Sequence, residues 1–302
     1  MSQKNRFFTA ALLLLFIPCF LFTQSASEPE HQAEFELRAV EIINQERINN
    51  GLPPFILDDT LFSLARSHSE DMVRNNFFGH TGSDRTTQSQ RVQRGIPNAA
   101  APFSHISANQ TPEGTAGVWL SSSRADILNV NRTHIGVGFA QRPEGSRARY
   151  GNYWTMYITH ILPVYTESEI QEFERRVFEL TNIEREKNGL RPLIWHDVLS
   201  TAARGHSEDL MRNNREGHIG SGNTSPSQRV QRLGIPNARV GENVAYANLT
   251  PEDAVRAWMN SPGHRRNILN REYTHLGVGF VQRVEGSRAS YVTYWTQKFG
   301  IF

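Results

Sequence analysis

The chain has 302 residues, of which 38% are hydrophobic and 21% are charged. This length is enough for two domains with cores of their own. There are 32 Lys and Arg residues against 30 Asp and Glu residues; residues 1–27 hold two of the basic residues, Lys4 and Arg6, and no acidic one, so 30 of each remain. A chain without net charge gives no electrostatic basis for binding nucleic acid.

The first 27 residues are typical of a secretory signal peptide. An apolar run, Phe7–Phe22, follows the two basic residues and precedes Ser25 and Ser27, small residues that suit cleavage. The run has about 16 residues, whereas a membrane-spanning helix needs roughly 20. We therefore expect export to the periplasm or the medium with no stable membrane span after cleavage; an uncleaved N-terminal anchor is the alternative. Cys19, the only cysteine, would leave with the signal, so the mature chain would lack disulfides.

The rest of the chain is an internal duplication. Ile43–Asn76 matches Thr181–Asn214 at an offset of about 138 residues, and SQRVQRGIPNA and SQRVQRLGIPNA differ by one inserted residue, Leu233. The match is nearly free of gaps, which indicates two copies of a whole domain rather than a solenoid. We place the domains at 33–162 and 168–302, joined by a linker at 163–167.

Each copy predicts the same elements in the same order. In the second copy, apolar residues at helical spacing predict a helix from Ile170 to Ile183, ended by Asn188-Gly189. A second helix is predicted from Asp197 to Leu210. A loop rich in Gly and Ser, 217–227, leads to a short helix at 228–233.

The last part of the copy combines turns, a helix and a hairpin. A turn is predicted at Gly241–Asn243, then a helix with Thr250 as its cap, and then a second turn at Ser261–His264. Two alternating, β-branched and aromatic segments, Gly277–Gln282 and Tyr291–Phe299, predict an antiparallel hairpin. In each copy the helices come first along the chain and the antiparallel strands come last, an order that indicates an α+β domain.

Three residues of the second copy could carry chemistry: His218, Glu242 and His264. Two imidazoles and a carboxylate can bind a divalent cation such as zinc and leave a position open for water or a ligand. Without a metal, they could act as a general acid and base. A purely structural role is the third interpretation, since no short ligand motif joins the two histidines.

Other polar residues favour plainer interpretations. His206 lies on the apolar face of its predicted helix, which predicts a hydrogen-bonded core histidine. Its counterpart His68 is kept in the first copy. Ser261 precedes a proline in a predicted turn with no His and Asp placed to activate it, which argues against a serine nucleophile.

The segments GENVA, VRAWMNSPGHRRNIL, THLGVGF and YWTQKFG resemble the bacterial branch of the CAP superfamily. That superfamily groups cysteine-rich secretory proteins, antigen 5 and pathogenesis-related 1 proteins, and its domain is also called the SCP domain. The resemblance covers nearly all of 168–302 and, more weakly, 33–162. It implies two tandem CAP-type domains, each a three-layer α-β-α sandwich.

The resemblance also implies a central cleft lined by two His and two acids, which in several members binds a divalent ion. Its first His falls on His218, its first Glu on Glu242 and its second His on His264, whereas Ser261 stands at the second Glu position. Asn243 is expected to line the cleft, and Trp258, or else Tyr246, to form an apolar wall.

In the first copy, the resemblance implies a degenerate domain. Of the cleft residues that the resemblance implies, the first copy retains His80, which corresponds to His218. Phe103 is predicted to replace the Glu, and Ala125 or a neighbour the second His. We expect no metal there.

These observations favour an extracytoplasmic binding module for a lipid, glycan or protein ligand over an enzyme, because no activated nucleophile is visible. One alternative is a metal-assisted hydrolase of a peptide or cell-wall bond that uses His218, Glu242 and His264, which predicts loss of activity but intact folding in Glu242→Gln. A purely structural envelope protein is the other.

Overall fold

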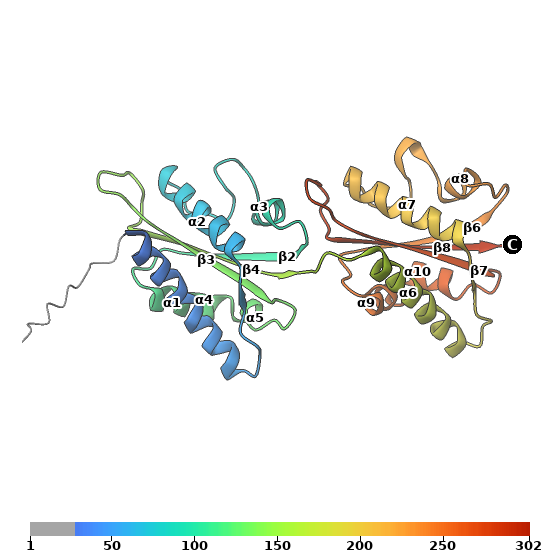
Figure 1. Ribbon diagram of the computed structural model, residues 1–302, viewed down its shortest axis with the longest axis horizontal. Coiled ribbons are helices and arrows are strands. Elements are labelled where there is room, and N and C mark those ends of the chain that lie inside the picture. The colour runs from blue at the N-terminus through green and yellow to red at the C-terminus, as the bar shows by residue number, and fades with distance from the viewer. Residues whose placement is uncertain (1–27) are drawn as a thin grey trace, which may run out of the picture.

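The computed structural model describes residues 28–302, and the predicted signal peptide at 1–27 lies outside them. Each repeat forms its own four-stranded sheet with helices on both faces, and the two domains follow each other along the long axis of the molecule (Figure 1). The α+β class and the three-layer α-β-α arrangement are confirmed. Within residues 28–302, no helix combines the length and the hydropathy that crossing a membrane requires.

The elements of the two domains correspond one to one, apart from a short 3-10 helix in the second. The first domain comprises α1 Glu28–Asn49, β1 Ile56–Leu57, α2 Asp59–Arg74, α3 Gln88–Gly95, β2 Ala99–Ser107, α4 Pro112–Ser122, α5 Arg124–Ile127, β3 His134–Gln141 and β4 Asn152–Ile161. The second comprises α6 Glu167–Lys187, β5 Ile194–Trp195, α7 Asp197–Asn213, η1 Ser221–Asn223, α8 Pro226–Gln231, β6 Arg239–Tyr246, α9 Pro251–Asn260, α10 Pro262–Ile268, β7 His275–Gln282 and β8 Thr293–Ile301.

The sheet of the second domain has the strand order β5-β7-β8-β6, and that of the first has the equivalent order β1-β3-β4-β2. The predicted hairpin is confirmed as β7 and β8, which pair antiparallel from His275 opposite Gly300 to Gln282 opposite Thr293. On its other side β8 pairs with β6. β8 therefore lies inside the sheet, so its side chains are buried on both faces.

Two glycines let helix α7 lie directly on strand β7. A Cβ added to Gly277 would stand 2.0 Å from the backbone nitrogen of Ser200, and one added to Gly279 would stand 2.1 Å from that of Arg204. No side chain fits in that space, which explains why each copy has glycine at both ends of its Gly-Val-Gly segment. The close contact places α7, and with it His206, against the middle of the sheet.

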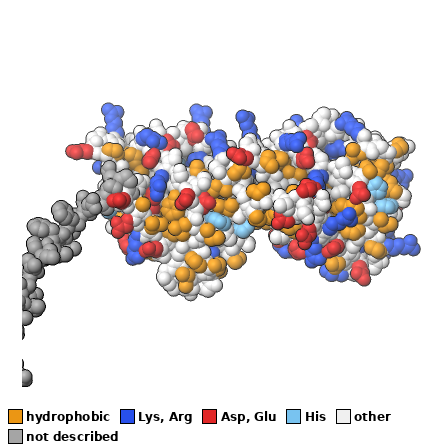
Figure 2. All heavy atoms as spheres, viewed as in Figure 1, with side chains coloured by type: hydrophobic (Ala, Val, Ile, Leu, Met, Phe, Trp, Pro, Cys, Tyr) orange, Lys and Arg blue, Asp and Glu red, His pale blue; other side chains and the backbone are white. Residues whose placement is uncertain are grey.

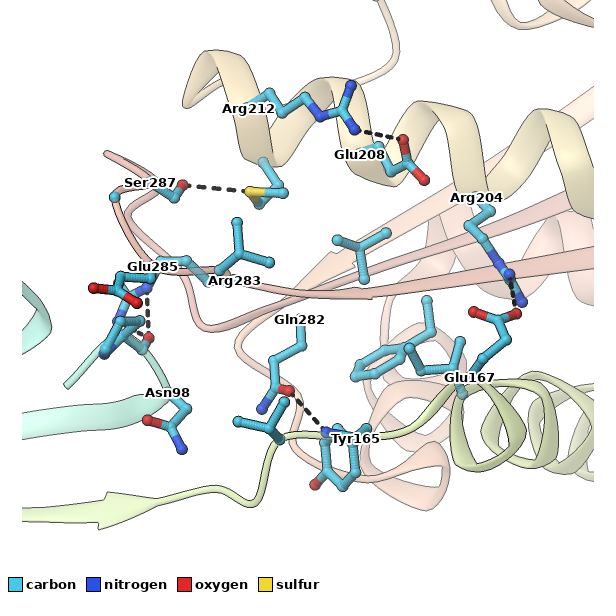
Figure 3. A pocket seen from close by; sticks show the side chains of 18 of the residues that line it. Asn98, Tyr165, Glu167, Arg204, Glu208, Arg212, Gln282, Arg283, Glu285 and Ser287 are labelled. Carbon is cyan, nitrogen blue, oxygen red and sulfur yellow. Dashed lines mark hydrogen bonds and ion pairs between the residues drawn. The ribbon is translucent and has the colours of Figure 1, made fainter.

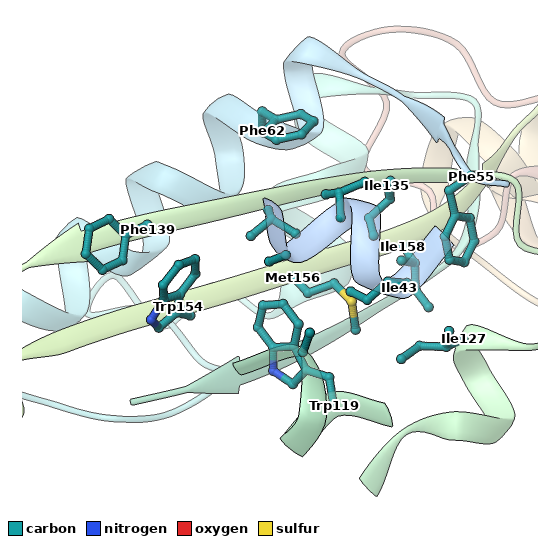
Figure 4. Close-up of a cluster of buried hydrophobic side chains, with 14 residues drawn as sticks. Ile43, Phe55, Phe62, Trp119, Ile127, Ile135, Phe139, Trp154, Met156 and Ile158 are labelled. Atoms are coloured by element: carbon teal, nitrogen blue, oxygen red, sulfur yellow. The ribbon is translucent and has the colours of Figure 1, made fainter. Parts of the chain in front are cut away.

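The opposite face of each sheet carries the main apolar core. In the first domain this core joins α1 and α4 to the sheet around Trp119, Trp154 and Phe139 (Figure 4). In the second domain Trp258, Trp295 and Phe280 stand in the corresponding core. Burying such large side chains supplies most of the stability of domains that have no disulfides.

An ion pair between a buried glutamate and a more exposed arginine links the two helical layers around the edge of each core. Glu174 of α6 accepts hydrogen bonds from Arg204 Nε (2.8 Å) and Nη2 (2.7 Å) and from the backbone N–H of Phe280 (3.0 Å). In the first domain Glu36 and Arg66 form the same pair. The pair thus belongs to the scaffold shared by both copies.

Two predicted turns were wrong. Gly241–Asn243 lies within strand β6, where every residue pairs with β8. The segment after Ser261 is helix α10, with Pro262 at its first position and His264 in its first turn. Proline suits a first helical position because its missing N–H would have no partner there, so the Ser-Pro-Gly-His segment begins a helix instead of reversing the chain.

Candidate functional site

Strand pairing places Glu242 at the centre of a buried polar cluster. Glu242 on β6 lies directly opposite Lys298 on β8, and both side chains are turned toward α7 and α8. The Glu242 side chain is 1% exposed and that of Lys298 is fully buried. We call Glu242, Lys298, Arg229, His206 and His218 the Glu242 cluster.

Two fixed cations neutralise the Glu242 carboxylate. Arg229 Nη2 lies 2.8 Å from Oε2 and 3.0 Å from Oε1, and the Lys298 ammonium donates to Oε2. Arg229 is held in turn by the carbonyl oxygens of Thr224 (2.7 Å) and His218 (3.0 Å). Charge-assisted bonds of this kind are strong in a buried environment, so the carboxylate has a fixed orientation.

Burial by itself raises the pKa of Glu242, but the hydrogen bond from His218 and the positive charges of Lys298 and Arg229 outweigh this effect. The pKa of Glu242 is lowered to about 2. Burial lowers the pKa of Lys298 to about 8, against the opposing attraction of Glu242. Both groups are therefore charged at neutral pH, and Glu242 is not a proton donor there.

His218 is the member of the cluster that reaches solvent. Its Nδ1 lies 3.0 Å from Glu242 Oε1, and 47% of its side chain is exposed. Because an ionised carboxylate can only accept, Nδ1 must carry the proton. In the tautomer that carries its proton on Nδ1, Nε2 is the acceptor nitrogen, and it lies on the side of the ring away from Glu242.

His264 is positioned by a buried asparagine rather than by a turn. Asn243 Nδ2 donates to the carbonyl oxygen of His264 (3.1 Å) and to Gln297 Oε1 (3.0 Å), while Asn267 Nδ2 donates to Asn243 Oδ1 (2.8 Å). At the other end of α10, Arg185 donates to the carbonyl oxygen of Ile268 (2.7 Å). Burial and the nearby His218 lower the pKa of His264, so its half-buried ring is neutral near pH 7.

The structure places the remaining predicted cleft residues differently. Asn243 is fully buried and Trp258 is 1% exposed, with its Nε1 donating to the carbonyl oxygen of Val244 (3.0 Å). Both therefore lie beneath the surface that carries His218 and His264. Ser261 is half-buried just before α10.

His206 is a core histidine, as its place on the helix predicted. It is fully buried, and Nε2 donates to the carbonyl oxygen of Gly217 (3.1 Å). The same Nε2 stands 3.5 Å from Glu242 Oε1, so His206 also faces the carboxylate. Burial lowers its pKa to about 4 and keeps the ring neutral.

Sequence reasoning missed Arg229 and Lys298. Arg229 belongs to the SQRVQR segment found in both copies, so nothing marked it as special to the second. Lys298 did carry a signal, because a lysine between Gln297 and Phe299 interrupts a strand that is otherwise suited to burial. A buried lysine requires an acidic partner, but the partner's identity depends on the strand register.

The register also corrects the predicted counterpart of Glu242 in the first domain. Ser104, rather than Phe103, takes its place: Ser104 lies opposite Tyr157 as Glu242 lies opposite Lys298. His80 Nδ1 contacts Ser104 Oγ at 2.9 Å, as His218 contacts Glu242. A register shift between Ala100 and Phe103 displaces the alignment by one residue.

The same comparison assigns Ser123, a neighbour of Ala125, to the place of His264. Buried arginines fix the match, because Arg47 donates to the carbonyl oxygen of Ile127 as Arg185 does to that of Ile268. A histidine that the prediction overlooked, His105, lies 2.5 Å from Ser123 Oγ through its Nδ1. The first domain thus has its own small polar cluster, built from histidine and serine side chains.

The donor set of the second domain does not fit a divalent cation as it stands. A metal ligand must offer a free lone pair, whereas each oxygen of Glu242 already has two hydrogen-bond partners: His218 and Arg229 at Oε1, and Arg229 and Lys298 at Oε2. Among residues 28–302, no three His, Cys, Asp or Glu side chains are grouped as metal ligands.

A hollow of about 960 Å³ lies at the boundary between the domains (Figure 3). No residue of the Glu242 cluster lines it. Tyr165, Phe280 and Met211 contribute apolar lining, and the side chain of Arg283 also lines the hollow. Arg283 Nε donates to the carbonyl oxygen of Pro97 in the first domain (2.7 Å). On the face shown in Figure 2, acidic and basic side chains are mixed over both domains, so that face presents no patch of one sign.

The duplicated fold and these motifs match a known family. The model of the cysteine-rich secretory protein family, CAP, matches residues 40–158 and 178–299. The chain belongs to this family. It holds two CAP domains in tandem.

Two curated relatives of this CAP protein come from Bacillus subtilis (strain 168). The uncharacterized protein YkwD is 44% identical over 132 residues, which are 44% of this chain and 48% of YkwD. The uncharacterized membrane protein YlbC is 37% identical over 126 residues, 42% of this chain and 34% of YlbC. The matches thus span less than half the length of either relative.

Solved structures are also similar to parts of the chain. An extracellular protein of Bacillus anthracis that contains an SCP domain is 26% identical, with a TM-score of 0.39 and coverage of 50% of this chain and 53% of that one. An outer surface protein of Borrelia burgdorferi is 20% identical, with a TM-score of 0.39 and coverage of 46% and 96%.

Proposed function

We propose that this tandem CAP protein is a binding module that acts outside the cytoplasm, with its ligand site at His218 and His264 of the second domain. One observation carries the proposal: His218 is fixed by the buried Glu242 and still exposes 47% of its side chain. The first domain keeps the scaffold but has Ser104 and Ser123 at the places of Glu242 and His264. The fold of the first domain forms without a carboxylate at this position. We therefore infer that Glu242 supports ligand binding in the second domain.

The chemistry of the site favours a ligand with hydroxyl or amide groups. His218 presents an acceptor nitrogen, and the neutral ring of His264 adds a donor and an acceptor nearby. Glycans and peptides carry the matching groups, whereas lipid tails do not. Fixing the ring through Glu242 reduces the entropy lost on binding.

The location outside the cytoplasm rests on residues 1–27, whose sequence is typical of an export signal. Two basic residues, an apolar run and then small residues follow one another there in the order that such a signal requires. Retention of the N-terminal segment as an anchor is the alternative, and mass spectrometry of the protein from its native envelope distinguishes the two.

The test uses muropeptides, soluble cell-wall fragments that combine glycan hydroxyls with peptide amides. The full chain is titrated by isothermal calorimetry beside His218→Ala and its first-domain counterpart His80→Ala. We expect saturable binding that is lost in His218→Ala and kept in His80→Ala. Equal binding by all three proteins, or none by the wild type, would contradict the proposal.

The metal-assisted hydrolase remains the competing function, with zinc held by His218, Glu242 and His264. It has less support, because Glu242 already accepts from Arg229 and Lys298. Zinc titration of the full chain beside His264→Ala separates the two functions. Micromolar binding that vanishes in the variant would favour the hydrolase and justify assays for released cell-wall products. A purely structural protein would respond to neither zinc nor muropeptides.

A further inference from the structure

The Glu242 cluster contains more positive than negative charge. One carboxylate faces the guanidinium of Arg229 and the ammonium of Lys298, with side-chain exposures of 1%, 12% and 0%. The contacting rings of His206 and His218 bring no further negative charge. The carboxylate of Glu242 is therefore more than neutralised by groups of the chain itself.

The first domain shows that the carboxylate and the ammonium occur together. Arg91 occupies the place of Arg229 there, but Ser104 and Tyr157 replace Glu242 and Lys298. The Tyr157 hydroxyl accepts from Arg91 Nε at 2.9 Å. In the second domain the corresponding nitrogen, Arg229 Nε, is buried without a partner. Tyr157 thus provides a partner for its arginine that Lys298 does not provide, and the contact that Lys298 makes instead is with Glu242.

A divalent cation at this place would meet unfavourable electrostatics. It would stand beside two buried positive charges, and like charges repel strongly where water is excluded. It would also need a lone pair of Glu242 that now accepts a charge-assisted hydrogen bond. A tethered ammonium has the further advantage of being part of the folded chain, since no binding equilibrium limits it.

We propose that Lys298, together with Arg229, takes the place of a metal ion at Glu242, so that the second domain works without a divalent cation. The same geometry means that Lys298 suppresses a latent zinc site. Removing the ammonium frees one lone pair of Glu242 Oε2, whose other hydrogen bond comes from Arg229, and takes one positive charge out of the cluster that holds His218. Zinc, which accepts imidazole and carboxylate ligands, is the ion that the freed residues suit.

The experiment measures zinc binding to the full chain by calorimetry, with zinc chloride as the probe, for the wild type, Lys298→Met and Lys298→Tyr. Lys298→Tyr copies the residue that the first domain places beside its own arginine, so it supplies a partner for Arg229 Nε and favours folding. Lys187→Met is the control, because that lysine is exposed and pairs with Glu184 on the surface. Circular dichroism and thermal melting report whether each variant is folded.

We expect a folded Lys298 variant to bind zinc at least about tenfold more tightly than the wild type and Lys187→Met. The gain should disappear when His264→Ala is added. Wild-type zinc binding as tight as that of the variant and dependent on His264 would overturn the proposal, as would a folded variant without any gain. The zinc titration of the wild type does not depend on the folding of any variant. Muropeptide binding is measured in a separate experiment, so the proposal about Lys298 can be rejected without rejecting the proposed ligand site, and the reverse also holds.

Discussion

Glu242 and Lys298 face each other directly across strands β6 and β8, and their charged groups are in contact inside the domain. This contact determines the role of Glu242 in the domain. The residue is a buried, ionised anchor for His218 and is itself held by two cations, Arg229 and Lys298. The predictions that follow test this arrangement and the scaffold that supports it.

Replacing Glu242 should weaken the domain. Glu242→Gln leaves Lys298 and Arg229 buried without their counter-charge, and breaking a buried ion pair costs about 3–5 kcal/mol. We therefore expect the free energy of unfolding of the second domain to fall by about 3 kcal/mol or more, measured by scanning calorimetry with the first domain as an internal reference.

Glu252→Gln is the control for that experiment. Glu252 pairs with Arg176 at the surface with about half of its side chain exposed. Such pairs contribute up to about 1 kcal/mol, so the control should melt close to the wild type. Equal melting of Glu242→Gln and Glu252→Gln would contradict the buried cluster.

Acid should destabilise both domains through their core histidines. Burial lowers the pKa of His68 and of His206 from 6.5 to about 4. Between these values the unfolded chain binds more protons than the folded chain, so stability is full above pH 6.5 and falls as the pH decreases toward 4. Each histidine contributes about 3 kcal/mol to this loss at most.

The measurement is the unfolding temperature of each domain as a function of pH. His206→Gln should flatten the profile of the second domain between pH 6.5 and 4 and leave that of the first unchanged, since His68 is intact. A profile of the second domain that keeps its slope in the variant would assign the acid sensitivity to other groups. The contribution of Glu242 lies lower, between pH 4.5 and 2.

Two Gly→Ala substitutions should differ in their effect on the free energy of unfolding. Gly279→Ala would place a Cβ 2.1 Å from the backbone nitrogen of Arg204, and neither backbone can move away without opening the domain. We expect a loss of at least about 3 kcal/mol, or failure to fold. Gly263→Ala meets no atom within 4 Å and should be neutral or stabilising by up to about 1 kcal/mol. Chemical denaturation of both variants measures the difference.

Arg283 should help to set the angle between the domains. Its side chain is buried, and Nε donates to the carbonyl oxygen of Pro97 across the domain boundary. Arg283→Ala should increase the radius of gyration in small-angle X-ray scattering while each domain stays folded. Its counterpart Arg142 bonds to Ala148 within the first domain, so Arg142→Ala should scatter like the wild type. Identical scattering of all three proteins would mean that Arg283 does not hold the domains together.

The sequence by itself determined the duplication, the α+β class, the main helices, the closing hairpin and the family. Local signals suffice for these features: apolar spacing defines helices such as the one that carries His206, Thr250 caps another, and alternation defines the strands. It also identified His218, Glu242 and His264 as unusual, because the first copy lacks two of the three.

Only the tertiary structure decided what surrounds Glu242. Lys298 lies 56 residues away along the chain and reaches the carboxylate because β6 and β8 pair in one particular register. A shift of one residue turns every side chain of a strand to the other face. The irregularity between Ala100 and Phe103 causes such a shift, so the counterpart of Glu242 is Ser104 and not the predicted Phe103. Register depends on how both strands and the helices above them pack together, and that information is spread over the whole domain rather than contained in any one motif.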